Sequence, residues 1–132
     1  MANELADCWL INGRPVEDVA PMVSDLRARS RPGKPLNFGI TGFALVRETD
    51  EEAERDLAAL LEVQRSSYPT RRTEMQKHID PQAGTLRYAE KYKGKAMIGA
   101  NGGTLPGLVG SYDRVAHQLA RFREAEIGRA HV

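Results

Sequence analysis

The sequence predicts an α/β fold in which helices cover a parallel sheet, and two features of its first half carry that prediction. Short hydrophobic runs alternate with segments of helical periodicity, in the order strand, helix, strand, helix. The second run, residues 36–47, is hydrophobic at nearly every position, which is typical of a parallel strand buried on both faces. Since the connections are short, the order favours right-handed β-α units in one sheet.

The first two elements are a strand and a helix. Residues 6–11 form a hydrophobic run that ends at the turn dipeptide Asn12–Gly13, which indicates a buried strand. Residues 15–30 then place hydrophobic side chains on one face at helical spacing: Val16, Val19, Ala20, Val23 and Leu26. Because proline removes a helix hydrogen bond, Pro21 predicts a kink or a late start of this helix.

A second helix follows the strand at residues 36–47. Thr49 and Glu52 have the spacing of a capping box, so the helix begins beside Thr49 and runs to about Gln64. Its hydrophobic stripe consists of Ala53, Leu57, Leu60 and Leu61. Two parallel strands leave both sheet edges unpaired and are too few for a stable domain. We therefore expect the other strands to lie outside these residues.

The second half of the chain does not continue this alternation of strands and helices. Residues 66–106 are rich in charge, weakly periodic and end in a glycine-rich run at 99–107. Such a segment is typical of an inserted lid or binding loop, and a surface excursion has the same composition. A last helix is predicted after the N-cap Ser111. Its hydrophobic stripe consists of Val115, Ala116, Leu119 and Phe122.

Composition argues against several classes of function. The chain has 132 residues, 41% of them hydrophobic, and a net charge of +1, so neither nucleic acid nor a membrane is an expected partner. The N-terminus does not resemble a signal peptide and Cys8 is the one cysteine, which suggests a cytoplasmic protein. His78, His117 and His131 lack metal-ligand spacing, so we expect no metal site.

Three segments together carry a resemblance to a known family. They are residues 6–15, which read ADCWLINGRP, residues 38–53, which read FGITGFALVRETDEEA, and residues 99–113, which contain GANGGT and GLVGSYD. In order and spacing they resemble the luciferase-like flavin-dependent monooxygenases, specifically the alkanesulfonate and dimethyl-sulfone branch. The resemblance extends from about Asn3 to Ala125.

The resemblance implies the C-terminal part of a (β/α)8 TIM barrel. The two strands would be the sixth and seventh of the barrel, residues 66–106 would lie in its insertion or lid region, and residues 107–125 would contain the helix before strand eight. Residues 1–125 would then be a partial luciferase-like domain whose other strands belong to sequence outside this chain.

The resemblance also implies an activity. Members take reduced FMN from an NAD(P)H:FMN reductase and use O2 to oxidise a small organosulfur compound, a sulfone or an alkanesulfonate. We expect the full-length protein to be a homo-oligomer and this chain alone to be inactive. Two alternatives stay open, a small non-catalytic α/β binding module and a subunit that completes a split barrel.

Few site residues follow from the resemblance, and no catalytic residue can be named. Sulfonate monooxygenases have an arginine and a histidine where this chain has Thr41 and Phe43, so we assign these two residues to the substrate pocket and expect an uncharged sulfone. Both could equally fill the barrel. Lys93 could line a lid over anionic groups, or lie in a solvated loop.

The glycine-rich run is the candidate cofactor site. The backbone amides of the run could approach the FMN phosphate, although a flexible hinge has the same sequence. The residues of this prediction are Asn101, Gly102, Gly103 and Thr104.

Residues 126–132 read Glu-Ile-Gly-Arg-Ala-His-Val. The resemblance implies a Gly-Ile-Asp type turn and a hydrophobic eighth strand here instead. The codons GAG ATC GGA AGA GCA CAC GTC can encode these residues and resemble a common sequencing adapter. We therefore interpret residues 126–132 as a non-native tail and leave them out of the predicted fold.

Overall fold

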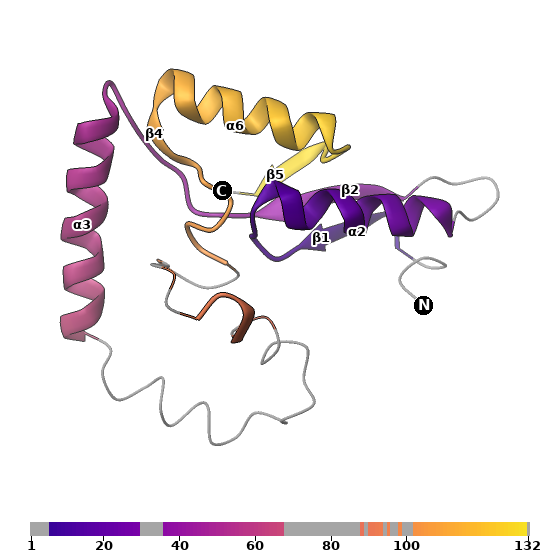
Figure 1. The fold of residues 1–132 in the computed structure, drawn as a ribbon, viewed down its shortest axis with the longest axis horizontal. Helices are drawn as coiled ribbons and strands as arrows, with labels where there is room; N and C mark the ends of the chain where they lie inside the picture. Colours follow the sequence, from indigo (N-terminus) through magenta and orange to yellow (C-terminus); the bar gives the residue numbers. More distant parts are fainter. Residues whose placement is uncertain are drawn as a thin grey trace.

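The computed structural model describes residues 6–29, 36–67, 88, 90–93, 95, 98 and 102–131. Figure 1 shows the elements, which are β1 (Cys8–Ile11), α2 (Val16–Ala28), β2 (Asn37–Thr41), β3 (Leu45–Arg47), α3 (Asp50–Ser67), β4 (Val109–Ser111), α6 (Tyr112–Glu124) and β5 (Arg129–His131). They make a three-stranded sheet in the order β1-β2-β5 and a two-stranded sheet of β3 and β4. Every pairing is parallel, as the sequence predicts.

The core lies between one face of the larger sheet and the helices α2 and α6. Alternation along the strands turns Ile11, Phe38 and Ile40 to this face, and all three are buried. The helices and the turn after α6 contribute Val16, Val19, Val23, Phe122 and Ile127 to the same cluster. On the other face Leu10 is 49% exposed. The described helices therefore cover one side of this sheet.

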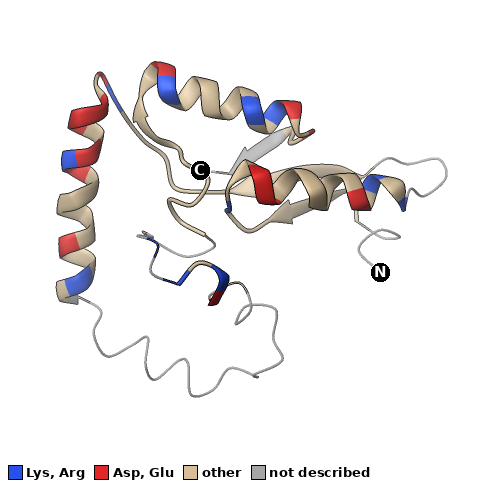
Figure 2. Cartoon of the chain, in the orientation of Figure 1, with Lys and Arg blue, Asp and Glu red and all other residues tan. Residues whose placement is uncertain are grey.

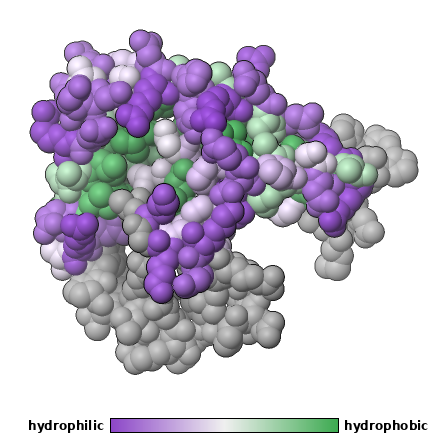
Figure 3. Space-filling view, in the orientation of Figure 1, coloured by the Kyte–Doolittle hydropathy of each residue, from purple (hydrophilic) through white to green (hydrophobic). Residues whose placement is uncertain are grey.

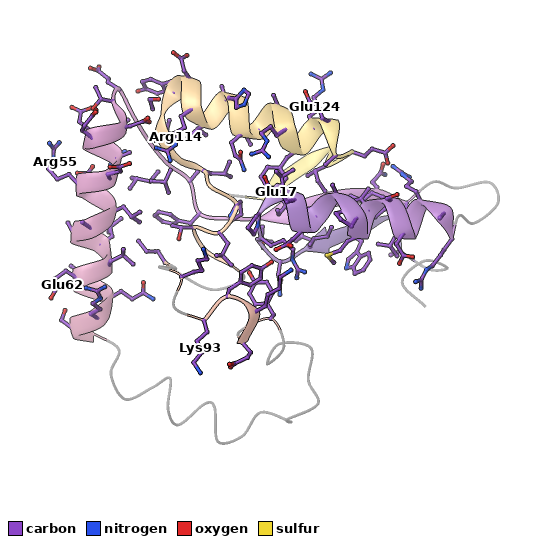
Figure 4. All side chains as sticks on the ribbon, in the orientation of Figure 1. Glu17, Arg55, Glu62, Lys93, Arg114 and Glu124 are labelled. Atoms are coloured by element: carbon purple, nitrogen blue, oxygen red, sulfur yellow. The ribbon has the colours of Figure 1, made fainter. Side chains whose placement is uncertain are left out.

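Charged side chains join the two helices at the surface of the core. Glu17 of α2 and Arg121 of α6 form an ion pair, and Glu17 lies between the two helices in Figure 4. At the other end of α2, Arg27 donates to the Leu36 carbonyl at 2.7 Å and pairs with Glu126 at 2.7 Å. The Arg27 guanidinium also lies 4.8 Å from the centre of the Phe38 ring. These contacts fix α2 and α6 relative to β2.

The α2 helix does not start late, contrary to one of the alternatives predicted from Pro21. It begins at Val16, directly after Pro15, and continues through Pro21 to Ala28. Proline removes one hydrogen bond from a helix, because it has no amide to donate to the carbonyl one turn earlier. Since Pro21 is on the exposed side of α2, that carbonyl lies near water. Packing of Val19 and Val23 holds the helix on the sheet.

The prediction of one continuous strand over residues 36–47 is wrong. The backbone leaves the larger sheet after Thr41, and β3 pairs with β4 in a second sheet. A Cβ on Gly42 would lie 3.0 Å from Cγ of Pro106, so the later segment packs directly against the break. The amides of Phe43 and Leu45 then donate to Gly103 and Leu108. Hydrophobicity alone does not reveal such a change of partner.

The α3 helix confirms the predicted capping box. The Glu52 amide donates to Oγ1 of Thr49 at 3.2 Å, and the Thr49 amide donates to the Glu52 carboxylate at 3.3 Å. The predicted stripe is less buried than expected. Ala53 is buried and Leu57 and Leu61 are partly buried, but Leu60 is 40% exposed. Figure 3 shows hydrophobic residues on the side of α3 that faces the central loops.

The α6 helix begins as predicted, since the Ser111 hydroxyl accepts from the Arg114 amide at 3.3 Å. Of its predicted stripe, Val115 and Phe122 are buried, whereas Ala116 is exposed and Leu119 is 41% exposed. The buried stripe of α6 is therefore narrower than predicted.

The last residues, which the sequence analysis leaves out of the fold, are part of it. The amides of Glu126 and Ile127 donate to Arg123 and Phe122, with Glu126 at φ 63°, which is a Schellman ending. Ile127 enters the core, and the Gly128 amide donates to the Phe38 carbonyl at 3.1 Å. Arg129–His131 then forms β5 beside β2. Residues 126–131 therefore belong to the described fold, Val132 lies outside the described residues, and the non-native origin of residues 126–132 stays a hypothesis.

We expect Ile127→Ala to lower the free energy of unfolding by about 2–4 kcal/mol, because Ile127 is 6% exposed and its loss leaves a cavity beside Phe122. Leu119→Ala on the exposed side of α6 is the matched control, with an expected loss below about 1 kcal/mol. Urea unfolding followed by circular dichroism measures both. Equal effects of the two variants would show that the last turn is not packed on the core.

Candidate functional site

Three segments meet at Gly13, at the carboxyl end of β1. The Gly13 amide donates to Oγ1 of Thr41 at 3.2 Å, and the Gly13 carbonyl accepts from the Tyr88 hydroxyl. A Cβ placed on Gly102 would lie 1.9 Å from the Gly13 oxygen, so this backbone packs here as well. In parallel α/β sheets the carboxyl ends of the strands are where sites form. This cluster is the candidate site.

Thr41 is the last residue of β2, whereas the strand predicted from the sequence continues through it to Arg47. Its hydroxyl accepts from the Gly13 amide and donates to the Ile11 carbonyl at 3.5 Å, so it ties the ends of β1 and β2 together. Phe43 is half-buried and lies beyond the strand, with its amide on the Gly103 carbonyl at 2.9 Å. Strand alternation therefore does not extend from Thr41 to Phe43. Their role in a substrate pocket stays a prediction.

The glycine-rich run forms a tight turn against the protein's own backbone. Gly102 and Gly103 have φ of 93° and 44°, values that residues with a Cβ rarely adopt. Both are buried, and a Cβ on Gly103 would lie 1.9 Å from the Ile98 carbonyl oxygen. The Thr104 carbonyl accepts from the Gly107 amide, and Asn101 lies outside the described residues. The space beside both α-carbons is therefore filled by other atoms of the protein.

Two tyrosines dock the segment around residue 90 onto this site, and neither is among the residues assigned to the site from the sequence. The rings of Tyr88 and Tyr92 meet edge to face with centroids 4.9 Å apart. The Tyr92 side chain is buried, and its hydroxyl donates to Oδ2 of Asp18 in the first turn of α2. Lys91 pairs with Oδ1 of the same carboxylate at 2.7 Å. The spacing of four residues between the tyrosines was the available signal, because it places both rings on one side of a helical turn.

These contacts shift the pKa values of the groups involved. Hydrogen bonds from Lys91 and then Tyr92 lower the pKa of Asp18 below its ordinary value. Burial and then the hydrogen bond to Asp18 raise the pKa of Tyr92, and burial raises that of Tyr88. At neutral pH the cluster therefore contains an ionised carboxylate and two protonated phenols.

Arg14 belongs to the loop between β1 and α2 and packs against Tyr88. Its guanidinium carbon is 5.0 Å from the centre of the Tyr88 ring, a cation–π contact. Nε donates to the Asn12 carbonyl at 3.2 Å, and Nη1 lies 3.1 Å from Sδ of Met22. Arg14 was not singled out from the sequence, where an isolated arginine after a turn carries no signal.

Lys93 is not brought together with the other predicted pocket residues. Its ammonium lies 3.4 Å from the Glu90 carboxylate, and the two side chains are 76% and 75% exposed. Figure 4 shows Lys93 directed away from the sheet. The Lys93 ammonium therefore lies in solvent on the outer side of the docked segment, as one of the two alternatives from the sequence has it, and a role over the site stays a prediction.

The chemistry available at the site is mainly that of positioning. Among the residues that the structure describes, no three His, Cys, Asp or Glu side chains gather as metal ligands. The side chains and amides around Gly13 hold the neighbouring loops together. None of the described helices has the length and hydrophobicity to cross a membrane.

Comparison with known proteins assigns the family. The model of the luciferase-like monooxygenase family matches residues 1–129 of this chain. The chain belongs to the luciferase-like monooxygenases. Among its relatives is an FMNH(2)-dependent dimethylsulfone monooxygenase of Pseudomonas putida, 34% identical over 62 residues, which are 46% of this chain and 17% of that protein.

A protein of the same description from Pseudomonas fluorescens (strain Pf0-1) is 32% identical over 63 residues, 47% of this chain and 17% of the relative. The match therefore spans about a sixth of the length of these relatives. The resemblance read from the sequence is confirmed at the level of the family.

We expect Gly102→Ala to lower the free energy of unfolding by about 2 kcal/mol or more, because a methyl group there meets the Gly13 oxygen and φ is positive. Gly128→Ala is the control, since no atom lies within 4 Å of a Cβ placed at that position. Chemical unfolding measures both variants. A neutral Gly102→Ala would mean that the glycine turn is not seated on the β1–α2 loop.

Acid is expected to weaken the contact between Asp18 and the docked segment. Because the folded-state pKa of Asp18 is lowered, its stabilisation is present above its ordinary value of 3.8 and is lost as pH falls through the folded-state value. Asp18→Asn should flatten the fall in melting temperature between neutral pH and pH of about 3. Asp25→Asn, on the exposed side of α2, should leave the fall in melting temperature unchanged. Thermal melts across this pH range compare the two variants.

Proposed function

We propose that this chain is the C-terminal part of an FMNH2-dependent two-component monooxygenase that oxidises a small organosulfur compound, a sulfone or an alkanesulfonate, with O2. The match of the luciferase-like family over residues 1–129 carries this proposal. The names of the two relatives support the finer statement, because both are FMNH(2)-dependent dimethylsulfone monooxygenases.

In this proposal β1 and β2 are the sixth and seventh strands of a TIM barrel, and β5 occupies the position of the eighth. The support is their parallel pairing in the order β1-β2-β5, with α2 between the first two and α6 before the third. Consecutive strands of a (β/α)8 barrel are neighbours in this way, with helices on the outside. The face of the sheet that carries Leu10 would then line the barrel, which agrees with the absence of described helices over it.

The substrate would lie at the carboxyl ends of these strands, beside Thr41 and Phe43. A hydroxyl that is already bonded to Gly13 and Ile11 offers no charge to a sulfonate, and Phe43 offers an apolar surface. An uncharged sulfone therefore fits this part of the site. The flavin supplies the oxygen chemistry when bound, and the chain contributes orientation and exclusion of water.

The cofactor and partners follow from the same proposal. Reduced FMN would come from an NAD(P)H:FMN reductase, with the amides of residues 102–104 near its phosphate. The full-length protein would be a homo-oligomer. The described residues hold no complete flavin site, so we expect this chain alone to lack activity.

A chimaera tests the proposal. The 62-residue stretch of the Pseudomonas putida enzyme that matches this chain is replaced by the corresponding residues of this chain. With a flavin reductase and dimethyl sulfone, we expect formaldehyde release within about tenfold of the parent enzyme, a margin of about 1.4 kcal/mol in transition-state stabilisation. A chimaera that folds and binds FMN like the parent, yet oxidises neither dimethyl sulfone nor methanesulfonate, would contradict it.

A further inference from the structure

Arg14 carries a positive charge at the candidate site, and no ion pair with another described residue uses this charge. Within the described part of the chain its donors meet a carbonyl oxygen and a thioether sulfur, and no carboxylate is in salt-bridge contact with it. The thioether is a weak acceptor. Since a guanidinium has five N–H donors in a planar fork, most of its capacity for strong acceptors is available.

The nearest acid, Asp18, is already engaged. Lys91 binds one oxygen of its carboxylate and the Tyr92 hydroxyl the other. The negative charge of Asp18 interacts electrostatically with the Arg14 guanidinium. The Lys91 ammonium, which is paired with Asp18, offsets this negative charge at close range. The balance around Arg14 is therefore positive, which favours an anion as ligand.

Tyr88 holds this arginine next to the glycine turn. The Tyr88 ring lies under the guanidinium at 5.0 Å, and its hydroxyl donates to the Gly13 carbonyl. A Cβ on Gly102 would come within 2.3 Å of that hydroxyl, so ring, loop and glycine turn are in direct contact. A guanidinium that is stacked on an aromatic ring loses less conformational freedom when it binds a ligand than one that moves freely in solvent.

We propose that Arg14 binds a small tetrahedral oxyanion, a sulfonate or a phosphate group, and that Tyr88 positions its guanidinium for this. The inference rests on the proposed function and deepens it. The two possible sources of the anion are the substrate and the phosphate of the flavin. Arginine recognises both through paired N–H···O bonds, so the chemistry is shared and the experiment separates them.

The test uses the whole isotope-labelled chain, titrated in separate arms with inorganic phosphate, methanesulfonate and the neutral dimethyl sulfone at low salt. Chemical-shift changes at the Arg14 side chain and in the 102–104 amides report binding. We expect saturable binding of at least one anion, weakened about tenfold by Arg14→Gln and less by Arg14→Lys. Arg55→Gln, on the exposed side of α3, removes the same charge and should leave binding unchanged.

Two further variants separate positioning from folding. Tyr88→Phe keeps the ring under the guanidinium and should bind within about twofold of the unaltered chain, whereas Tyr88→Leu should weaken binding as Arg14→Gln does. The amide spectrum of the core residues Val19 and Phe38 shows whether each variant is folded.

Each outcome of the titration has one meaning. Binding of methanesulfonate in preference to phosphate assigns the site to the substrate, and the reverse preference assigns it to the flavin phosphate. No saturable binding of either anion, equal binding by Arg14→Gln, or an equal loss in Arg55→Gln overturns the proposal. Because the titration contains no flavin or reductase, its failure and failure of the chimaera are independent results.

Discussion

The pairing of β2 on both of its edges is the constraint on which the rest of the structure depends. Ile40 is in register with Ile11 on one side and with Ala130 on the other. A slip of one residue would turn Phe38 and Ile40 away from the helices and expose the core. Because all three strands are parallel, this register also brings their carboxyl ends to one level, where the Thr41 hydroxyl reaches the Gly13 amide.

The candidate site is built from backbone more than from reactive side chains. Gly13 is contacted by Thr41, Tyr88 and the Gly102 turn, and each of these contacts uses the Gly13 amide, its carbonyl or the space beside it. Such a site orients and encloses a reactant. It agrees with a family in which a flavin performs the oxidation, since the protein then needs geometry and a dry surface rather than an acid–base pair.

Charged side chains in the described part of this molecule mainly connect helices and strands to one another. Figure 2 shows both signs interspersed along the described helices, and the ion pairs link α2 to α6, and α6 to α3 through Arg114 and Asp50. Surface pairs of this kind contribute little stability individually. Among the described residues, Arg14 lies beside the candidate site without a carboxylate partner and stacks on the Tyr88 ring.

The sequence by itself determined the parallel α/β character, the helix starts at Thr49 and Ser111 and the family, because periodicity, capping and local motifs are short-range properties. Only the tertiary structure decided that the strand over residues 36–47 divides at Gly42, that Ile127 enters the core, that Tyr88 bonds to Gly13 and that Tyr92 bonds to Asp18 of α2. Each of these depends on contact between residues far apart in the chain. A local pattern such as the spacing of the two tyrosines does not give the partner of such a contact, so the residues around Gly13 could be found only once the fold had brought them together.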